Sequence, residues 1–276
     1  MSELQQISLT EDCACVLGAR GSVAVSGGEY AKYGGATTCI AVRLSGQLIV
    51  MDAGSGILRL PSVLRETDTD IPLLLSHPHT DHLLGLLSCP VFYKKEITVG
   101  CYAAEHGGLK PEEQIGRLFS PPLWPVGPEM LPAGFRYHTV SGDFTIGDVT
   151  VKTMEGCHPG GVTVFRLEGG GKSVVLATDC TLREEYLPRL AEFAADCDLL
   201  FCDGQYSDAE WASRKDFGHS TWTSAARLGV LCHAKRMRIV HHDPGHSDAV
   251  LDGAEAEVRR IFPYCSMAYE GEVIEL

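Results

Sequence analysis

The sequence of 276 residues contains no apolar run near the ~20 residues that a membrane-spanning helix requires, and no run of five or six basic residues. Basic residues are also scarce, because 23 Lys and Arg against 36 Asp and Glu give a formal net charge of −13. This balance argues against binding to duplex DNA or tRNA through neutralisation of backbone phosphates. Residues 1–6 lack the basic and apolar regions of a secretory signal. We therefore expect a cytoplasmic protein without membrane contact.

Because no export is expected, the eleven cysteines should be reduced thiols. Cys13 and Cys15 form a Cys-x-Cys pair, but a metal site there would need two further ligands nearby, and none is obvious. We expect both to be buried as small apolar residues. Hydrophobic residues make up 45% of the chain and are spread evenly, which excludes intrinsic disorder.

Short apolar runs bounded by turn residues predict strands, and longer runs with one apolar face predict helices. Strands in both halves of the chain, with helices between them, favour an α/β fold with two packed sheets and helices outside. One domain over residues 1–276 is expected. We predict strands at 39–44, 47–51, 72–75, 97–99, 162–167, 173–177, 199–202, 237–240 and 273–274, a hairpin at 144–151, and helices after Pro111 and at about 182–195, 221–233 and 249–261.

Three histidines and one aspartate fall within six residues, directly after an apolar strand: His77, His79, Asp81 and His82. His77 and His79 are two apart in an extended turn and can project to the same side. The adjacent Asp81 and His82 must diverge or address a second centre. This spacing suits two metal ions side by side rather than one closed structural site. The alternative, a polar surface loop with chance histidines, fits the density of these residues less well.

Further candidate ligands stand at the ends of other predicted strands. Each of them alone would more often be a structural residue, but together they supply the mixed nitrogen and oxygen donors that an open two-metal site needs. An aspartate at such a position can bridge two cations with its two oxygens. These candidates are His158, Asp179 and one of the neighbours His241 and His242.

The spacing His77-x-His79-x-Asp81-His82 resembles the signature of the metallo-β-lactamase fold superfamily, and the resemblance covers almost the whole chain. It implies an α/β fold, a four-layer αβ/βα sandwich with two mixed β-sheets flanked by helices. It also implies two divalent metal ions, with zinc favoured and manganese or iron also suited to such ligands. By analogy one ion takes His77, His79 and His158, the other takes Asp81, His82 and His241, and Asp179 bridges them together with a water or hydroxide.

Two further residues are expected to support the ligands. Asp52, in Met51-Asp52-Ala53-Gly54, looks like the first motif of the superfamily and is expected to hold a ligand histidine by its second nitrogen. Strand register favours His241 over His242 as the ligand. His242 would then lie behind a ligand or contact the substrate.

Gly218-His219-Ser220-Thr221 resembles the His-Ser-Thr motif of the RNase Z-like phosphodiesterases within this superfamily. The resemblance implies that His219 protonates the leaving alkoxide as a general acid. Asp81 is expected to bind metal and to orient the nucleophile. The alternative for the motif is a plain helix start, with Ser220 or Thr221 as the N-cap.

The favoured function is a dinuclear metallohydrolase acting on a small or cyclic phosphodiester through a metal-bridging hydroxide. About twenty residues separate His158 from Asp179, too few for the basic arm that tRNA-processing members insert there, so a small phosphate-containing substrate is expected instead of tRNA. Alternatives are hydrolysis of a thioester or lactone on the same centre, or a di-iron redox or sensor protein. The resemblance also implies a homodimer. Residues 105–128 are expected to form a loop over the site entrance, where Phe119 and Trp124 could stack on a ring.

Overall fold

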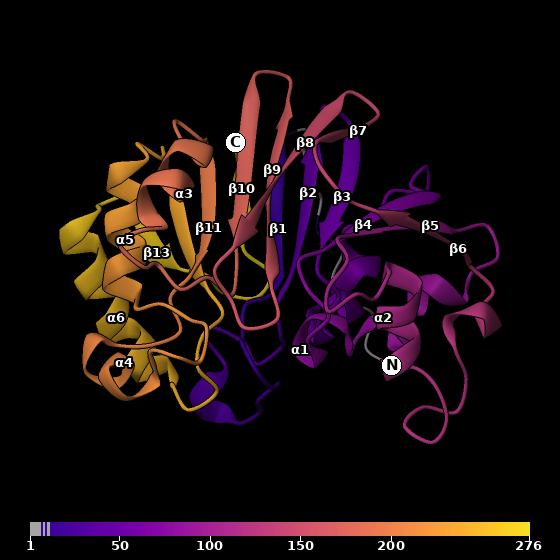
Figure 1. The fold of residues 1–276 in the computed structure, drawn as a ribbon, viewed down its shortest axis with the longest axis horizontal. Coiled ribbons are helices and arrows are strands. Elements are labelled where there is room, and N and C mark those ends of the chain that lie inside the picture. The colour runs from indigo at the N-terminus through magenta and orange to yellow at the C-terminus, as the bar shows by residue number, and fades with distance from the viewer. Residues whose placement is uncertain (1–6, 8, 10–11) are drawn as a thin grey trace.

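The computed structural model describes residues 7, 9 and 12–276. The segment on which the expected absence of a secretory signal rests lies outside these residues. Within them the chain forms two seven-stranded sheets that pack face to face, with helices on both outer sides (Figure 1). The expected α/β sandwich of two mixed sheets is confirmed. No helix in this described part is both long and apolar enough to cross a membrane.

The first sheet is half antiparallel and half parallel. Its strands pair antiparallel from β14 to β3 and parallel from β3 to β6. In spatial order they are β14 (Val273–Glu275), β1 (Cys13–Gly18), β2 (Cys39–Leu44), β3 (Gln47–Met51), β4 (Asp70–Leu75), β5 (Thr98–Ala103) and β6 (Gly134–Thr139).

The second sheet repeats this division. Its strands pair parallel from β13 to β10 and antiparallel from β10 to β7. In spatial order they are β13 (Cys265–Met267), β12 (Met237–Val240), β11 (Leu199–Asp203), β10 (Lys172–Ala177), β9 (Val162–Gly169), β8 (Val149–Gly156) and β7 (Phe144–Ile146).

Helices cover the outer face of each sheet. The first sheet carries α1 (Thr80–Leu83), α2 (Pro111–Leu118) and the short 3-10 helices η2 (Ser55–Ser62), η3 (Leu86–Ser88), η4 (Pro90–Tyr93) and η5 (Pro128–Met130). The second sheet carries α3 (Leu187–Phe193), α4 (Asp208–Arg214), α5 (Trp222–Leu231) and α6 (Asp248–Ile261), while η1 (Gly28–Tyr30) lies near α6.

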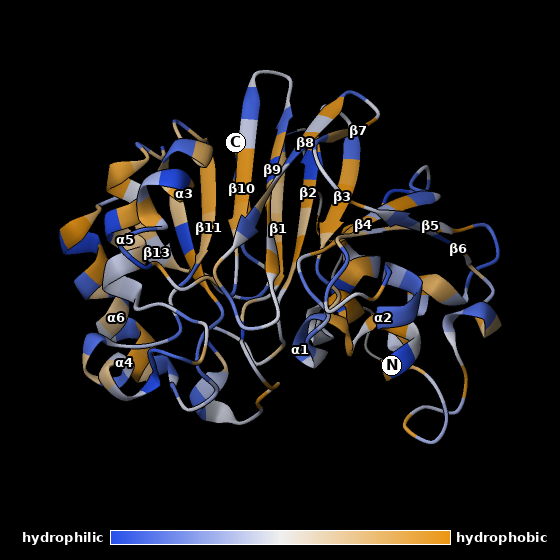
Figure 2. Cartoon of the chain, viewed as in Figure 1, coloured by the Kyte–Doolittle hydropathy of each residue, from blue (hydrophilic) through white to orange (hydrophobic). Residues whose placement is uncertain are grey.

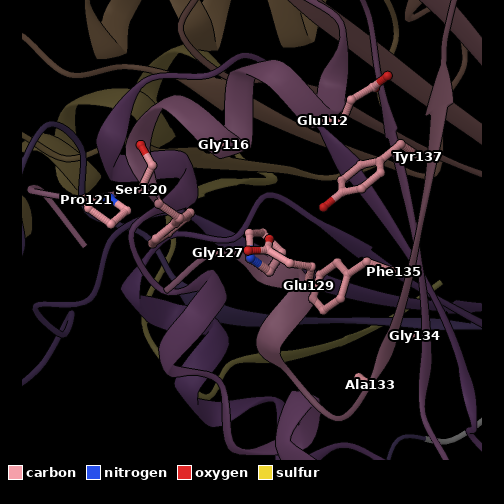
Figure 3. Close-up of a pocket in the computed structure, with 12 residues that line it drawn as sticks. Glu112, Gly116, Ser120, Pro121, Gly127, Glu129, Ala133, Gly134, Phe135 and Tyr137 are labelled. Carbon is pink, nitrogen blue, oxygen red and sulfur yellow. The ribbon is translucent and has the colours of Figure 1, made fainter. Parts of the chain in front are cut away.

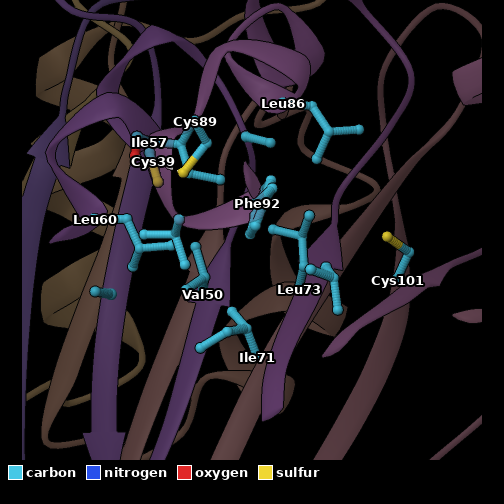
Figure 4. Close-up of a cluster of buried hydrophobic side chains, with 14 of the residues drawn as sticks. Cys39, Val50, Ile57, Leu60, Ile71, Leu73, Leu86, Cys89, Phe92 and Cys101 are labelled. Carbon is cyan, nitrogen blue, oxygen red and sulfur yellow. Dashed lines mark hydrogen bonds between the residues drawn. The ribbon is translucent and has the colours of Figure 1, made fainter. Parts of the chain in front are cut away.

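Three buried apolar clusters hold these four layers together. One lies between the two sheets, one between the second sheet and α3, α5 and α6, and one between the first sheet and its outer helices. Figure 4 shows the last of these, in which Phe92 packs among leucines and isoleucines. Figure 2 shows the strands mainly as apolar and the loops below the sheets mainly as polar. Cys13 and Cys15 are fully buried in β1, as expected.

The structure contains strands that the sequence did not reveal. β1 and β13 were missed, because their Cys, Ala and Ser residues lack the β-branched and aromatic character that marks a strand. β6 was also missed, although Phe135, Tyr137 and Thr139 alternate in it as strand residues do. The helix expected at about 182–195 is shorter, since Pro188 fixes the start of α3 near residue 187.

A buried ion pair ties β2 to the loop before β4. The guanidinium of Arg43 is 1% exposed and donates to both carboxylate oxygens of Asp68, at 3.2 and 2.6 Å. We expect Asp68→Ala to lower the free energy of unfolding by about 3–5 kcal/mol, because it leaves a buried charge without its partner. Urea denaturation measures this loss. The control is Lys32→Ala, which breaks the exposed ion pair with Asp252 and should cost less than about 1 kcal/mol. Equal losses in the two variants would contradict the argument.

Candidate metal centre

The predicted ligands gather where parallel strands end, at the edge of the sandwich near α1. His77 follows β4 after one residue, Asp179 follows β10 after one residue, and His241 follows β12 directly. Carboxyl ends of parallel strands meet at one edge of a sheet, which brings Asp179 and His241 together in the second sheet. The packing of the two sheets places His77, from the first sheet, beside them. The remaining ligands lie beside them: Asp81 and His82 in α1, His79 just before it, and His158 between β8 and β9.

Three residues of the site take a left-handed backbone conformation. Asp52, Asp179 and His241 have φ angles of 61°, 52° and 63°. Asp and His tolerate this region better than most residues, but each instance still costs on the order of 1–3 kcal/mol. These three residues lie where the chain leaves the sheets, and their backbone turns the side chains toward one another.

A first group of donor atoms is formed by His77, His79, His158 and Asp179. One atom of each lies within 4.8 Å of all the others. The Nδ1 of His79 is 2.9 Å from the Nε2 of His77 and 3.2 Å from the Nε2 of His158. The Asp179 Oδ2 is 3.6 Å from the Nε2 of His77. Three imidazole nitrogens and one carboxylate oxygen therefore surround one small space.

A second group is formed by Asp81, His82, Asp179 and His241, again within 4.8 Å. The Asp81 Oδ2 is 3.3 Å from the Nε2 of His82 and 3.1 Å from the Nε2 of His241. Asp179 approaches His82 with Oδ1 and His241 with Oδ2, each at 3.2 Å. Asp179 thus belongs to both groups, and all seven ligands predicted from the sequence lie together.

Outer contacts fix the orientation of the imidazoles. The Nδ1 of His82 donates to Asp52 at 2.8 Å, and Asp52 is itself held by the backbone and hydroxyl of Ser76. The Nδ1 of His158 donates to the carbonyl of Gly218 at 2.9 Å. Gly218 has a φ of +92°, and a Cβ there would lie 2.3 Å from that nitrogen, so only glycine fits. Asp52 therefore lies behind His82, one of the predicted ligands.

These donors fit a divalent cation. The buried Nε2 of His82 lies 3.3 and 3.2 Å from oxygens of Asp81 and Asp179 but has no hydrogen-bond partner among the described residues. Burial by itself lowers the pKa of His82, but Asp179 and the other nearby carboxylates raise it well above the ordinary value. Burial by itself lowers the pKa of His241, but Asp179 and the hydrogen bond to Asp81 outweigh it and raise that pKa to about 9. The carboxylates of the cluster therefore stabilise a positive charge placed among them. The imidazole and carboxylate donors suit zinc, manganese or iron.

The structure adds one site residue that the sequence interpretation missed. Asp203 ends β11 and accepts a hydrogen bond from Nδ1 of His219 at 2.7 Å. Its other oxygen accepts from the backbone of Gln205, whose side-chain oxygen lies 3.2 Å from Nδ1 of His241. Asp203 therefore orients His219 and, through Gln205, the predicted ligand His241. The strand-end pattern that marked Asp179 could also have marked Asp203.

The motif around His219 serves two purposes. Thr221 is the N-cap of α5, because its side chain accepts from the backbone of Ser224. His219 lies just before this cap and lines the same cavity as His158 and Asp179. The helix start thus positions the histidine, so the two interpretations of the motif do not compete.

His242 lies apart from this cluster. It is fully buried, its Nε2 donates to the carbonyl of Ala268 at 2.8 Å, and its ring packs against Tyr33. Burial lowers its pKa to about 3. The expectation that His242 contacts a ligand or a substrate is therefore not met among the described residues.

A cavity of about 570 Å³ opens onto the cluster. Its walls include Ser22, Tyr206 and Phe217, and the ring of Phe217 is 61% exposed. Trp222, which flanks the same motif, is buried and donates its indole N–H to Glu257. An exposed aromatic ring at the mouth of the cavity is available to a substrate.

The expectation that residues 105–128 form a loop over the site entrance is wrong. None of its residues lines the metal cavity, and part of it forms α2. Phe119 is 1% exposed and packs against Trp124 in the core, so neither ring faces the site. The segment instead borders a separate cavity of about 490 Å³ between α2, η5 and β6, into which Tyr137 and Glu129 project (Figure 3).

Loading with a divalent metal is expected to stabilise the protein, since the ion binds only the assembled cluster. At about 1,000 times the dissociation constant the gain is about 4 kcal/mol. For a chain of this size that raises the melting temperature by roughly 8–16 °C. Calorimetry of metal-stripped protein, before and after addition of zinc or manganese, measures the shift. A variant with Asp81→Ala and His82→Ala serves as the control and should show a smaller rise. An unchanged melting temperature would contradict metal binding at this cluster.

The family model for the beta-lactamase superfamily domain matches residues 48–242. This range includes every residue of the two donor groups, and the chain belongs to that superfamily. Among solved structures, the metallo-β-lactamase fold protein YhfI from Bacillus subtilis has a TM-score of 0.72 at 20% identity, over 95% of this chain and 99% of that one. The short form of human tRNase Z has a TM-score of 0.68 at 18% identity, over 95% and 98%. The four-layer fold expected from the sequence is therefore confirmed.

The curated relatives are ribonucleases Z. The protein from Bradyrhizobium diazoefficiens is 23% identical over 82% of this chain and 89% of its own length. Two shorter matches, to the proteins from Gemmatimonas aurantiaca and Lachnospira eligens, are 34% and 31% identical but span only 26% and 28% of those relatives. Superfamily membership together with the cluster of histidines and aspartates fits a metal-dependent hydrolase.

Proposed function

We propose that the protein is a metal-dependent phosphodiesterase that uses two divalent ions, with zinc favoured and manganese or iron also suited. The observation that carries the proposal is the pair of donor groups that share Asp179 beside His219. The names of the relatives support cleavage of a phosphodiester. The whole chain would act as one hydrolase domain, and a homodimer and a cytoplasmic location stay predictions.

Divalent ions held by the two groups would supply positive charge to the phosphate oxygens and lower the pKa of water. The protein's own residues then divide the remaining work. Asp81 is fixed by the backbone N–H of Ser22 at 2.8 Å and by His241, and it lines the cavity where it can orient the attacking water. His219 donates through Nδ1 to Asp203, which leaves Nε2 to carry a proton to the leaving oxygen.

A small or cyclic diester is the favoured substrate. The chain between His158 and Asp179 is occupied by the β9–β10 hairpin, which turns at Gly170 and Gly171 without an inserted arm. The net charge of −13 also disfavours a polyanion. A precursor tRNA is the second candidate substrate. The matched proteins include ribonucleases Z and a tRNase Z, and these names favour keeping tRNA as a candidate.

The test is hydrolysis of bis(p-nitrophenyl) phosphate by metal-stripped protein reloaded with manganese or zinc. Turnover should depend on the metal and should vanish in the Asp81→Ala, His82→Ala double variant. Precursor tRNA is assayed in parallel and should not be cleaved. Absence of diester turnover with metal demonstrably bound would overturn the proposal in favour of a thioester or lactone substrate, or of a redox role.

A further inference from the structure

The metal cavity offers an anionic substrate few hydrogen-bond donors besides the ions that it would hold. No Lys or Arg is among the described residues that line it. The lining side chains that are polar and are not predicted metal ligands are those of Ser22, Thr80, Tyr206 and His219. His219 is proposed above to act on the leaving oxygen. Of the three hydroxyl residues, Ser22 is the one joined to a predicted ligand by a printed contact of its own, a hydrogen bond to Asp81.

The turn formed by Gly21 and Ser22 lies directly against two predicted ligands. The backbone N–H of Ser22 donates to Oδ2 of Asp81 at 2.8 Å. Three covalent bonds of about 1.5 Å separate that nitrogen from the Ser22 hydroxyl oxygen, so the hydroxyl lies beside the same carboxylate. A Cβ at Gly21 would lie 2.2 Å from Nδ1 of His241, so only glycine permits this approach.

Arg20 holds this turn in place. Its side chain is fully buried and donates to three backbone carbonyls, those of Gly34, Asp243 and His246, at 2.8, 3.1 and 2.7 Å. The backbone N–H of Gly21 also donates to the carbonyl of His242 at 3.0 Å. Ser22 itself has a left-handed φ of 61°, which is uncommon for a residue other than glycine. The contacts of the turn therefore fix Ser22 in a conformation that serine rarely adopts.

A chain of hydrogen bonds sets the direction of the Ser22 hydroxyl. The Nε2 of His241 faces Asp81, and its Nδ1 donates to the side-chain oxygen of Gln205 at 3.2 Å. The amide nitrogen of Gln205 in turn donates to the hydroxyl oxygen of Ser22 at 3.2 Å. Because an amide nitrogen can only donate, the hydroxyl oxygen accepts this bond and its own proton must point to another group.

That proton has no acceptor among the residues that the structure describes. Ser22 is exposed and lines the metal cavity, so the hydroxyl is available to a group bound there. A phosphate oxygen is an anionic acceptor, and a neutral donor already fixed in place stabilises the charge that develops on it during reaction. The surroundings of Ser22 therefore suit an oxygen of a phosphate bound beside Asp81.

We propose that the Ser22 hydroxyl is a catalytic group that donates a hydrogen bond to a non-bridging oxygen of the substrate phosphate. The proposal rests on the phosphodiesterase function proposed above. It gives the hydroxyl a part distinct from that of His219, which acts on the leaving oxygen, and from that of the Ser22 backbone, which holds Asp81.

Ser22→Ala and Ser22→Gly test the proposal together, because both remove the hydroxyl and keep the backbone N–H that binds Asp81. Alanine retains the backbone strain and glycine relieves it, so a loss common to both belongs to the hydroxyl. Each variant should lower kcat/KM about tenfold or more, by a similar factor on bis(p-nitrophenyl) phosphate and on a dinucleoside monophosphate, with metal content unchanged. The control Ser45→Ala, at a serine with a φ of 50° between β2 and β3 and outside the cavity, should leave turnover unchanged.

Four results would overturn the proposal: unchanged turnover, a loss in one of the two variants alone, a matching fall in metal content, or a loss confined to the dinucleoside monophosphate. The last would place the hydroxyl at the leaving group. Failure of the proposed function is distinguishable, because metal-loaded wild-type protein would then hydrolyse neither diester. Calorimetric titration with inorganic phosphate decides in that case. Binding that is about tenfold weaker in both Ser22 variants than in the wild type supports the donor, whereas equal affinities, or no binding to the wild type, refute it.

Discussion

Asp179→Asn is expected to reduce phosphodiester turnover by about a thousandfold or more. Asp179 is the one residue present in both donor groups, and its carboxylate lies within 3.9 Å of five histidines: His77, His82, His158, His219 and His241. Burial opposes its ionisation, yet the imidazoles hold the pKa of its carboxyl well below the ordinary value. The amide keeps the shape but loses the charge and one ligand atom. Loss of about 4 kcal/mol of transition-state stabilisation corresponds to that thousandfold.

Metal content measured by mass spectrometry should fall together with turnover in Asp179→Asn. The matched control is Asp196→Asn, since Asp196 also has a left-handed φ, of 53°, but lies exposed and outside the cluster. Both substitutions place asparagine in a backbone conformation that it tolerates, so strain is the same in both. Full metal content and unchanged turnover in Asp179→Asn would refute its shared position in the proposed two-ion site.

His219→Ala is expected to lower the turnover of a dinucleoside monophosphate by about 10²–10⁴-fold, the usual contribution of a general acid. The alkoxide that leaves such a diester needs a proton, and His219 is aligned to supply it by Asp203. A p-nitrophenyl ester needs no such proton, because p-nitrophenolate is a stable leaving group. The same variant should therefore lose much less activity on bis(p-nitrophenyl) phosphate.

Asp203→Asn provides a milder test of the same pair. Removing the carboxylate should cost about 10- to 100-fold on the dinucleoside monophosphate, because the histidine remains but its orientation and charge are no longer supported. Metal content should stay near the wild-type value in both variants. Equal losses on the two kinds of diester, or loss of metal in His219→Ala, would assign His219 to the ligand set instead of to proton transfer.

The central strands and the ligand cluster were predictable for a common reason. β4, β10 and β12 are buried apolar runs, and polar side chains stand directly after each, so the sequence shows both the strand and the place where it ends. Parallel pairing of β10, β11 and β12 then brings Asp179 and His241 to one edge of the second sheet, and the packing of the two sheets brings His77 beside them. Local pattern and topology agree here, which makes the inference dependable.

Other features depend on contacts that no local pattern records. Asp203 follows an apolar strand like Asp179, but its importance comes from the tertiary hydrogen bond to His219. The direction of the His242 side chain depends on the carbonyl of Ala268, 26 residues away. Strand register favours His241 as the ligand, but it leaves open which group the neighbouring imidazole contacts. The burial of Phe119 likewise follows from packing of α2 against the first sheet.

The two donor groups draw on both sheets. His77, His79, Asp81 and His82 follow β4 of the first sheet, whereas His158, Asp179 and His241 belong to connections of the second. In the proposed site each ion would be bound by residues of both sheets. Separating the sheets at this edge would therefore also cost the free energy of ion binding. Linkage makes this relation reciprocal. A movement that opens the sandwich at this edge must weaken the hold on the ions, and binding of the ions must restrict that movement to the same extent.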